Sequence, residues 1–339
     1  MYPYIRTLLF RFDPERAHAL TINLLRLSGA IPPLAALLRY WYKGPARPVN
    51  AFGLSFANPI GLAAGYDKDG LGWRGLACLG FGHIEVGTVT PQPQDGNPRP
   101  RIFRLPDERA LINRMGFPGR GADFLVRQLA VTRPDNLVLG VNIGKNRITP
   151  IEEAHRDYIS LFQTFSPLAD YLAVNVSSPN TVGLRSLQAR QNLNQLLGAL
   201  SAERRSLVGD TSRNIPILVK LAPDLSESEL DDALEVILAN NMDGVIVSNT
   251  TIGREGIQSP LASESGGLSG APLSNLCTRL VRQVHQKTGG KLPIIGVGGI
   301  ENANGVQEKL DAGATLVQIY TGLIYEGPGL VKRILQELH

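Results

Sequence analysis

Eight short apolar runs recur from residue 60 onward, each followed by a polar loop and then by a stretch with helical spacing. Alternation of buried strands with helices is typical of a parallel sheet covered by helices, and eight such units predict an α/β fold, a closed (β/α)8 TIM barrel. The runs are residues 60–64, 84–89, 137–143, 171–176, 217–221, 244–247, 294–297 and 316–320.

Other segments add detail to this repeat. Residues 47–58 have the pattern of a small two-stranded hairpin ahead of the first barrel strand. The longest gap, between the second and third runs, contains residues 101–104 and 110–113, which we interpret as a hairpin inserted over the barrel mouth. Ser226 and Glu229 form a capping-box pattern, which predicts a helix extending to Asn240.

Residues 1–46 have the pattern of a separate helical module. Asp13 is a favourable N-cap with Pro14 at the first helical position, and Gly29 follows the last apolar position. A second helix is predicted over residues 34–42, apolar on most sides with aromatic residues at one end. Both helices suit a membrane interface, and both also suit packing on the rest of the chain. We therefore divide the chain into this module and a barrel domain of residues 47–339.

Charge and composition limit the kinds of binding partner that the chain can have. The net charge is +4 over 339 residues, and residues 1–50 hold seven Lys or Arg against two Asp or Glu. A basic first segment on a near-neutral body favours an anionic surface, and the lack of a basic run with interleaved aromatics argues against nucleic acid. No apolar stretch reaches the roughly 20 residues that span a bilayer, and the start of the chain lacks a secretory cleavage pattern.

Cysteine and histidine usage bears on redox and metal chemistry. Cys78 and Cys277 are the two cysteines of the chain, which argues against a disulfide framework and favours a reducing compartment. The five histidines lack ligand spacing and no Cys-x-x-Cys motif is present. We therefore expect neither a metal ion nor an iron–sulfur cluster.

Polar residues gather where the eight apolar runs end. In a parallel barrel these ends form one rim, and barrel active sites lie on that rim. A cap or turn explains one polar strand end, but not eight in register. The rim residues are Gly65, Tyr66, Asp67, Lys68, Gly87, Thr88, Asn142, residues 175–180, Lys220, Ser248, Asn249, Thr250, Gly298, Gly299, Tyr320, Thr321 and Gly322.

The most distinctive of these ends is Asn-Val-Ser-Ser-Pro-Asn at residues 175–180. Alone, it matches a turn after a buried strand. On the rim of a barrel it matches a catalytic loop, in which Ser178 is a base and Asn175 and Asn180 hold a small polar substrate. Because no histidine motif accompanies Ser178, we expect it to accept a proton rather than to attack an acyl group.

Glycines follow the last barrel strands. Gly298 and Gly299 come after the seventh run, Gly322 follows the eighth, and residues 266–270 lie in the loop after the sixth. Loops after strands seven and eight of a barrel commonly bind phosphate, because glycine lets backbone N–H groups approach the oxygens. Tight turns are the alternative. A phosphate site implies a phosphorylated substrate or a cofactor such as FMN.

Lys220 lies within an apolar run, and strand alternation directs it inward. A buried lysine is paired or functional: it either forms a Schiff base, as in aldolases, or offsets charge on a reduced flavin. Lys68 suits both possibilities. Amide side chains favour the flavin and a pyrimidine ring, since each offers one acceptor and two donor hydrogens. These amides are Asn113, Asn175, Asn180 and Asn249.

Together these motifs resemble the class 2 dihydroorotate dehydrogenases, the quinone-linked, membrane-associated bacterial type, over essentially the whole chain. They are Gly-Leu-Ala-Ala-Gly-x-Asp-Lys-Asp-Gly (61–70), Gly-Thr-Val-Thr-Pro (87–91), Asn-Arg-Met-Gly-Phe (113–117), Asn-Ile-Gly-Lys-Asn (142–146), Asn-Val-Ser-Ser-Pro-Asn (175–180), Lys-Leu-Ala-Pro-Asp (220–224) and Ile-Gly-Val-Gly-Gly-Ile (295–300). Serine at position 178 fits class 2, because the soluble class carries cysteine there.

The resemblance implies oxidation of (S)-dihydroorotate to orotate in pyrimidine biosynthesis. Ser178 would take the C5 proton, with Thr250 or a water relieving its own proton, while the C6 hydride passes to N5 of one FMN per chain. Ubiquinone or menaquinone would reoxidise the flavin. The protein would be a monomer, attached through residues 1–46 to the lipid surface on the cytoplasmic side of a bacterial cell membrane.

Site residues follow from the resemblance by position. FMN contacts would be Ala64, Gly65, Tyr66, Asp67, Lys68, Thr88, Asn142, Asn175, Lys220, Ser248, Gly270, Gly299, Tyr320 and Thr321. Substrate contacts would be Lys68, Asn113, Arg114, Met115, Gly116, Phe117, Asn175, Asn180, Asn249 and Thr250. His18, Arg104 and Tyr320 would lie near the quinone, in a tunnel lined by the first two helices. The alternative for His18 is a capping or solvent-facing role.

Tyr66 and Ser248 depart from the leucine and threonine of the family pattern; Ser248 keeps the hydroxyl, and Tyr66 changes packing beside the flavin. Three other functions are weighed against this one: another FMN barrel oxidoreductase acting on a pyrimidine in RNA, a flavin-free aldolase using Lys220, and a non-catalytic binding barrel. The weak basic charge and the N-terminal helices argue against the first.

Overall fold

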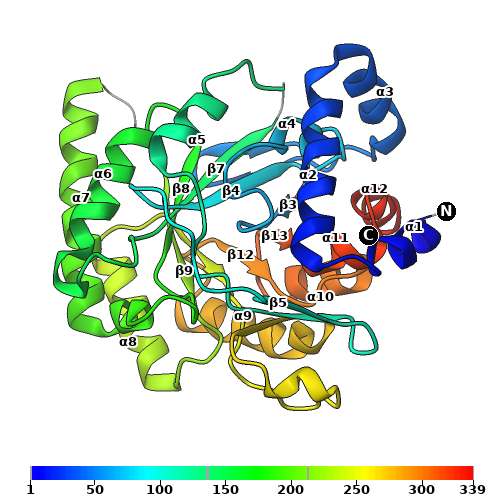
Figure 1. Cartoon of the computed structure of the whole chain (residues 1–339). Coiled ribbons are helices and arrows are strands. Elements are labelled where there is room, and N and C mark those ends of the chain that lie inside the picture. Colours follow the sequence, from blue (N-terminus) through cyan, green and yellow to red (C-terminus); the bar gives the residue numbers. More distant parts are fainter. Residues whose placement is uncertain (1, 135–136, 212–213, 339) are drawn as a thin grey trace.

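The computed structural model describes residues 2–134, 137–211 and 214–338, and its centre is a closed barrel of eight parallel strands (Figure 1). The strand order is β3-β4-β7-β8-β9-β10-β12-β13, and β13 pairs with β3 to close the barrel. The predicted (β/α)8 barrel is confirmed. Its strands are β3 (Ile60–Leu62), β4 (His83–Val89), β7 (Val138–Ile143), β8 (Tyr171–Asn175), β9 (Ile217–Leu221), β10 (Gly244–Val247), β12 (Ile294–Val297) and β13 (Leu316–Ile319).

Helices surround the barrel, with α6, α7 and α8 along one side in Figure 1. The predicted capping box of α8 is present, because Ser226 Oγ accepts from the Glu229 N–H and the Glu229 carboxylate accepts from the Ser226 N–H. The elements are α4 (Trp73–Ala77), α5 (Ala122–Leu129), α6 (Ala154–Phe165), α7 (Arg190–Thr211), α8 (Glu227–Ala239), α9 (Ser274–Lys287), α10 (Ala303–Asp311), α11 (Thr321–Glu326) and α12 (Leu330–Glu337), with single 3₁₀ turns η1 (Ile151–Glu153), η2 (Leu184–Gln188), η3 (Pro260–Ser263) and η4 (Ala271–Leu273).

The two ends of the barrel differ. At the amino ends of the strands, the predicted hairpin of β1 (Val49–Ala51) and β2 (Leu54–Phe56) is confirmed, and the Phe56 ring lies 5.4 Å from the ring of His83, the first residue of β4. At the carboxyl ends, Asn175 pairs with Lys220 in register, so polar side chains of neighbouring strands meet there. Apolar side chains therefore cover the amino end of the barrel, whereas polar side chains gather at its carboxyl end.

A three-stranded antiparallel sheet lies outside the barrel. It contains the predicted inserted hairpin, β5 (Ile102–Leu105) and β6 (Ala110–Asn113), and a third strand, β11 (Gly267–Gly270), that pairs with β6. The expectation that residues 266–270 form only a loop is therefore wrong. Glycine is required in β11 because a Cβ at Gly267 would lie 2.0 Å from Thr250 Oγ1, so the strand runs directly against the loop after β10.

The first residues form α1 (Tyr2–Leu9), α2 (Pro14–Ala30) and α3 (Pro32–Tyr42). The predicted Asp13 cap is confirmed, with Oδ1 accepting from two backbone N–H groups at 3.0 Å. The sequence analysis missed α1, which is anchored where Tyr2 donates its hydroxyl to the Ile324 carbonyl at 2.7 Å. Helix α2 touches α4 backbone to backbone, since a Cβ at Gly75 would lie 2.1 Å from the Leu25 carbonyl oxygen.

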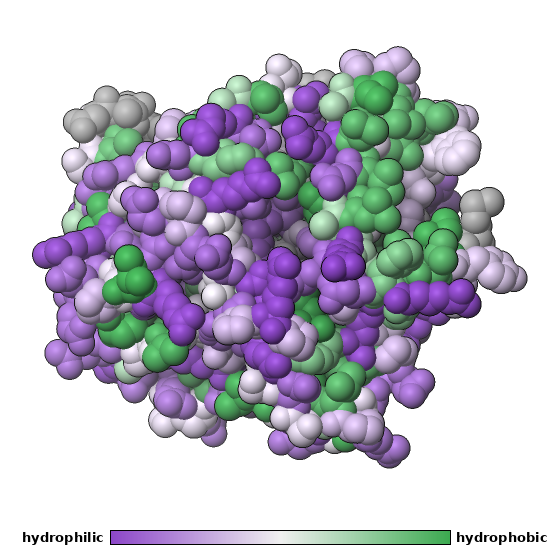
Figure 2. Space-filling model, viewed as in Figure 1, coloured by the Kyte–Doolittle hydropathy of each residue, from purple (hydrophilic) through white to green (hydrophobic). Residues whose placement is uncertain are grey.

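The opposite face of these helices is apolar and exposed, and Figure 2 shows hydrophobic surface gathered over α2 and α3. Leu24 and Leu27 are 60% and 61% exposed, and Trp41 is 60% exposed. Within the described residues, no single helix has the length and apolar composition to cross a bilayer; α2 and α3 together meet the criteria only as a pair bent by 106°. One face of the module packs on the rest of the chain, as the second interpretation predicts, and the other face is left open, so contact with a membrane stays a prediction.

Candidate active site

A cavity opens at the carboxyl end of the barrel and encloses about 1030 Å³, part of it open to solvent. This size matches a site for a small ligand or cofactor. The structure brings most of the predicted FMN and substrate residues to its wall. They are Ala64, Gly65, Lys68, Thr88, Asn113, Met115, Gly116, Phe117, Asn175, Ser178, Asn180, Lys220, Ser248, Asn249, Thr250, Gly270, Gly299, Tyr320 and Thr321.

Other predicted site residues lie behind this wall. Tyr66 packs edge-on between His18 and Tyr320, with ring centroids 5.2 and 5.7 Å away. Asp67 accepts the backbone N–H groups of residues 71 and 72 and so organises the loop after β3; burial raises its pKa to about 6. The Arg114 side chain pairs with Glu264 at 2.6 Å instead of pointing into the cavity.

Asn142 also lies beneath the wall, in a chain of polar groups that supports the cavity floor. Thr88 Oγ1 donates to Asn142 Oδ1 at 2.5 Å, and Asn175 Nδ2 donates to Thr88 Oγ1 at 2.9 Å. Asn142 Nδ2 in turn donates to Glu85 Oε1 at 2.8 Å. Side chains from the ends of β4, β7 and β8 are thereby fixed relative to one another.

Glu85 is the centre of this floor, and the sequence analysis missed it. Its carboxylate is fully buried and accepts from Asn142, from the Tyr171 hydroxyl at 3.0 Å and from Gln318 Nε2 at 2.9 Å. Lys220 Nζ lies 3.9 Å from Glu85 Oε1. These partners all present donor groups to the carboxylate oxygens. The sequence does contain a signal for this floor: Glu85 and Gln318 are polar residues inside apolar strand runs, as Lys220 is, and buried polar residues of this kind need partners.

The same floor presents unmatched polar groups to the cavity, which tests whether a flavin fits. Gln318 Oε1 is buried and has no hydrogen-bond partner within the described part of the chain. Burial lowers the pKa of Lys220, and Glu85 opposes that shift without a close contact. Both side chains line the cavity. A ring with neighbouring acceptors and N–H groups would satisfy them, so these residues fit a flavin.

At another part of the wall the backbone itself is bare. Gly298 and Gly299 line the cavity with φ of +110° and +71°. A Cβ at Gly299 would lie 2.4 Å from the backbone nitrogen of Ser274, the first residue of α9. Glycine is therefore needed for this loop to pack on α9, and it leaves a side-chain-free surface suited to a phosphate group.

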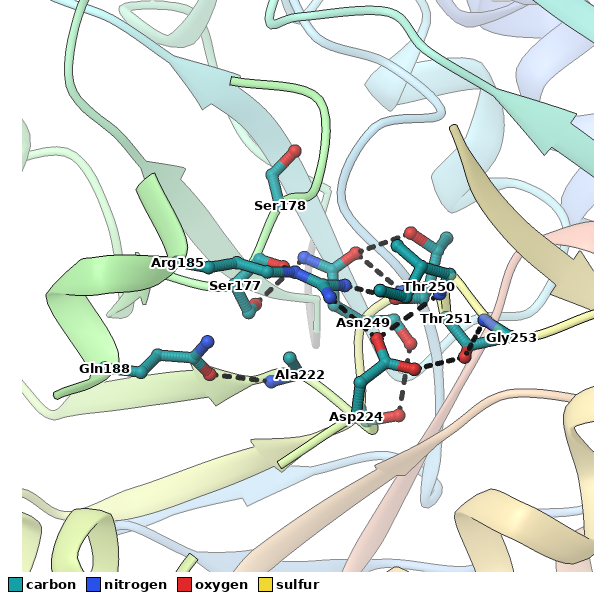
Figure 3. Close-up of polar contacts among 12 residues, drawn as sticks. Ser177, Ser178, Arg185, Gln188, Ala222, Asp224, Asn249, Thr250, Thr251 and Gly253 are labelled. Atoms are coloured by element: carbon teal, nitrogen blue, oxygen red, sulfur yellow. Dashed lines mark hydrogen bonds and ion pairs between the residues drawn. The ribbon is translucent and has the colours of Figure 1, made fainter. Parts of the chain in front are cut away.

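The loop after β8 places Ser178 in the cavity wall. Ser178 Oγ accepts from the Asn180 N–H at 3.3 Å, and Asn180 Nδ2 donates to Asn113 Oδ1 at 3.1 Å. Behind it, Asn249 Nδ2 donates to Ser177 Oγ at 2.9 Å. Figure 3 shows Ser178 pointing away from the polar contacts that surround Ser177. Among the described residues, Ser178 and Thr250 share no hydrogen bond, so the expected relay between them has no direct link here.

Lys68 lies at the other side of the cavity. Its Nζ donates to the Gly65 carbonyl at 2.8 Å, and burial lowers its pKa to about 8. An ammonium held by one neutral carbonyl is available to an anionic ligand group.

A second, larger cavity extends from Tyr320 toward the N-terminal helices. It is lined by His18, Arg104 and Tyr320, the residues expected near a quinone, and it shares Lys68 and Asn113 with the first cavity. Burial, and secondarily the Lys68 charge, lower the pKa of His18 to about 4, so the imidazole is neutral. Arg104 Nη1 donates to the Phe12 carbonyl at 2.8 Å and thereby holds the turn between α1 and α2.

A closed parallel barrel whose cavity combines a buried ammonium, convergent amides and a bare glycine loop defines the class of the protein: a barrel oxidoreductase with a flavin site. Residues 48–339 match the family described as dihydroorotate dehydrogenase. The chain belongs to that family, whose members are flavin-dependent, and within it to the quinone-type class 2. The predicted resemblance is confirmed.

Relatives and solved structures agree with this assignment. The chain is 49% identical over 339 residues to "Dihydroorotate dehydrogenase (quinone)" of Azotobacter vinelandii, covering 100% of this chain and 96% of the relative. It is 48% identical to the protein of the same name from Escherichia coli, covering 99% of each. A crystal structure of ligand-free DHODH from Eimeria tenella superposes with a TM-score of 0.86 at 39% identity, covering 96% of this chain and 94% of the other.

Proposed function

We propose that this chain oxidises dihydroorotate to orotate with FMN as the hydride acceptor and a membrane quinone as the final oxidant. The observation that carries the proposal is the convergence on one cavity of Ser178, Lys220 and the four asparagines, at positions 113, 175, 180 and 249. Such a set matches a planar ring with alternating N–H and C=O groups and places a hydroxyl beside it. The names of the relatives support the same substrate and oxidant.

Bound FMN would supply the two-electron acceptor for this reaction. The glycine loop at 298–299, with Thr321, would hold its phosphate, and Thr88, Lys220 and Gln318 would meet its ring. Lys220 would offset negative charge that develops there, because its ammonium lies in a buried site with only a distant carboxylate. Because Glu85 is buried as well, the Lys220 ammonium and the carboxylate that faces it would both lie inside the barrel.

Ser178 Oγ would take a proton from the substrate carbon that faces it. A serine hydroxyl is a weak base, so its efficiency depends on a group that relieves its own proton and on its position. The Asn180 N–H donates to Ser178 Oγ, which orients the hydroxyl and leaves its hydrogen free to be passed on. A water or the Thr250 hydroxyl would receive that hydrogen.

The second cavity would admit the quinone. Its walls include apolar residues of α1, α2 and α3; the outer face of α2 and α3 is exposed and hydrophobic, and the first 50 residues hold seven Lys or Arg against two Asp or Glu. These features support a peripheral position on the cytoplasmic face of a bacterial membrane, with residues 1–46 in contact with lipid. His18, Tyr66 and Tyr320 would form an aromatic row between the two cavities.

One experiment tests the whole proposal. The purified protein is assayed with dihydroorotate and, in turn, a soluble quinone, fumarate and NAD as acceptors, and its visible spectrum and released cofactor are recorded. We expect a yellow protein that releases one FMN per chain and turns over with the quinone alone. A colourless protein, or turnover with fumarate or NAD but not with quinone, would contradict the proposal.

A further inference from the structure

Three active-site loops are joined behind Ser178 by one guanidinium, that of Arg185. Arg185 lies in η2, in the connection between β8 and α7. Its Nε donates to the Ser177 carbonyl at 3.1 Å and its Nη2 donates to the Thr250 carbonyl at 3.1 Å. Its Nη1 lies 2.8 Å from Asp224 Oδ2. Figure 3 shows this side chain lying between the loops that follow β8, β9 and β10.

Asp224 is itself held in place. It accepts from the Thr251 hydroxyl and, at 3.3 Å, from the Ile252 N–H, so it fastens the loop after β10 a second time. The two ion-pair side chains are only 24% and 20% exposed. A charge-assisted, partly buried arrangement of this kind has a defined geometry, because the planar guanidinium fixes the directions of its donors.

A second side chain of η2 repeats the connection. Gln188 is buried and its Oε1 accepts the Ala222 N–H at 2.9 Å, which ties η2 to the loop after β9. The segment that carries Arg185 is therefore anchored at its own end as well. Arg185 cannot shift without breaking contacts to neighbouring loops.

The two carbonyl groups that Arg185 holds are adjacent to the reacting groups. The Ser177 carbonyl belongs to the peptide unit that leads into Ser178, and the Thr250 carbonyl belongs to a residue that also lines the cavity. Arg185 does not line the cavity, and Ser178 points away from it (Figure 3). Its influence on the reaction therefore acts through the backbone.

We propose that Arg185, anchored by Asp224, is a positioning residue that fixes the separation of Ser178 and Thr250 and so the point at which the substrate loses its proton. The inference rests on the proposed function, because it assigns proton transfer to Ser178. Misplacement of a reacting group by about 1 Å can cost about 10²-fold in rate.

The test uses the FMN-loaded full chain with Arg185→Met, Arg185→Lys and Asp224→Asn. Anaerobic rapid mixing with dihydroorotate gives the rate of flavin reduction, and an equilibrium titration gives the dissociation constant of orotate. We expect Arg185→Met to slow reduction by about 10- to 100-fold with less than a threefold change in orotate affinity. In Arg185→Lys and Asp224→Asn the rate of flavin reduction should fall by less, because each variant keeps some of the hydrogen bonds that join the loops.

Arg190→Met is the matched control. Arg190 pairs with Asp232 and Glu235 at 2.6 Å on an exposed helix face, and among the described residues these polar contacts do not reach an active-site loop. We expect its flavin reduction to equal that of the unmodified chain. If Arg185→Met also reduces at that rate, the positioning role is overturned.

A combination with Ser178→Ala separates positioning from general damage. When Ser178 is absent, Arg185 has no proton acceptor to place, so the double variant should be within about twofold of Ser178→Ala alone. A further 10-fold loss in the double variant would show that Arg185 only holds the site together, and the inference would fail. The proposed function fails separately, if the unmodified chain shows no flavin reduction by dihydroorotate or if Ser178→Ala reduces at the full rate.

The pH profile gives a further readout. Near neutral pH the proton transfer depends on a well-placed serine, whereas at high pH hydroxide competes for the same proton. The deficit of Arg185→Met should therefore shrink as the pH rises. A deficit that is constant over the whole pH range would count against positioning.

Discussion

Ser178 and its neighbours set the chemistry at the scale of single residues. Ser178 Oγ has a backbone N–H donor and lies in the wall of the flavin cavity, while Ser177, one residue earlier, is turned toward Asn249. Adjacent serines thus point in different directions: the first links two loops, and the second lines the cavity proposed for the substrate.

We expect Ser178→Ala to slow flavin reduction by dihydroorotate by about 10²- to 10⁴-fold near neutral pH, as for loss of a general base. Bound FMN should stay the same, because no cofactor contact is removed. Anaerobic rapid mixing measures the rate, and Ser186→Ala is the control, since Ser186 Oγ donates only to the exposed Gly183 carbonyl of the same segment. Equal rates in the two variants would rule out Ser178 as the base.

Lys68 gives a pH dependence of ligand binding. Its pKa is lowered by burial to about 8, so the ammonium is present below that pH and is lost above it. An anionic ligand such as orotate binds the charged form. Its affinity should therefore be constant below about pH 8 and fall by at most about tenfold per unit above it.

Titration of the FMN-loaded protein with orotate from pH 6 to 10 measures this dependence. In Lys68→Met the affinity should be weaker at neutral pH and nearly independent of pH. A slope that persists in Lys68→Met would assign the titration to another group.

Much of the site at this scale was predictable from the sequence, for a physical reason. The residues at strand ends, such as Thr88 and Asn249, reach the cavity because parallel strands end at one rim. Glu85 and Arg185 were not predicted. Glu85 lies inside a strand and Arg185 lies nine or more residues beyond one, and their roles depend on partners brought together only by the folded barrel.

At the scale of secondary structure elements, the N-terminal helices have two unlike faces. One face of α2 packs on α4 through glycine contacts, and the other exposes Leu24 and Leu27. The helix boundaries predicted from sequence agree with the structure to within about two residues, as expected for capped helices. Strand β11 escaped prediction because its Gly-Leu-Ser-Gly sequence has little strand propensity, and pairing with β6 overrides that preference.

The exposed face can be tested without disturbing the packed one. We expect the double variant Leu20→Glu/Leu27→Glu, at exposed positions that do not line the second cavity, to lose at least about tenfold in binding to lipid vesicles and in turnover with a membrane quinone, because it places charge in the proposed lipid interface. Reduction of a water-soluble dye by dihydroorotate should be unchanged. Vesicle co-sedimentation and the two turnover assays provide the measurements.

Deletion of residues 1–46 is the companion experiment. It keeps Arg47, whose guanidinium donates to carbonyl groups at the end of α12. Dye reduction should survive the deletion and quinone reduction should be abolished. Retained quinone turnover in the shortened chain would contradict the role proposed for α2 and α3.

At the scale of the whole molecule, the cavity proposed for the cofactor is bordered by the ends of seven of the eight barrel strands, and the eighth, β7, supports its floor through Asn142. Removal of FMN should therefore lower stability globally rather than locally. With free FMN at 100 times its dissociation constant, ligand binding stabilises the folded state by about 2.7 kcal/mol.

Thermal unfolding of FMN-loaded and FMN-free protein measures this effect. The midpoint should rise with added FMN and should rise less with riboflavin, which lacks the phosphate expected at the glycine loop. If FMN and riboflavin raise the midpoint equally, the glycine loop does not bind the phosphate of FMN.

The sheet of β5, β6 and β11 bears on the order in which the molecule is made. Asn113 and Gly267 pair in this sheet although they are 154 positions apart, so synthesis of the intervening half-barrel separates them in time. On the ribosome, one edge of the hairpin formed by β5 and β6 stays unpaired until residue 270 has emerged. Long-range pairing of this kind is slow and exposes strand edges to other chains. Nascent chains halted before β11 should therefore leave the free edge of β6 open to cross-linking, whereas chains halted after residue 270 has emerged should protect that edge.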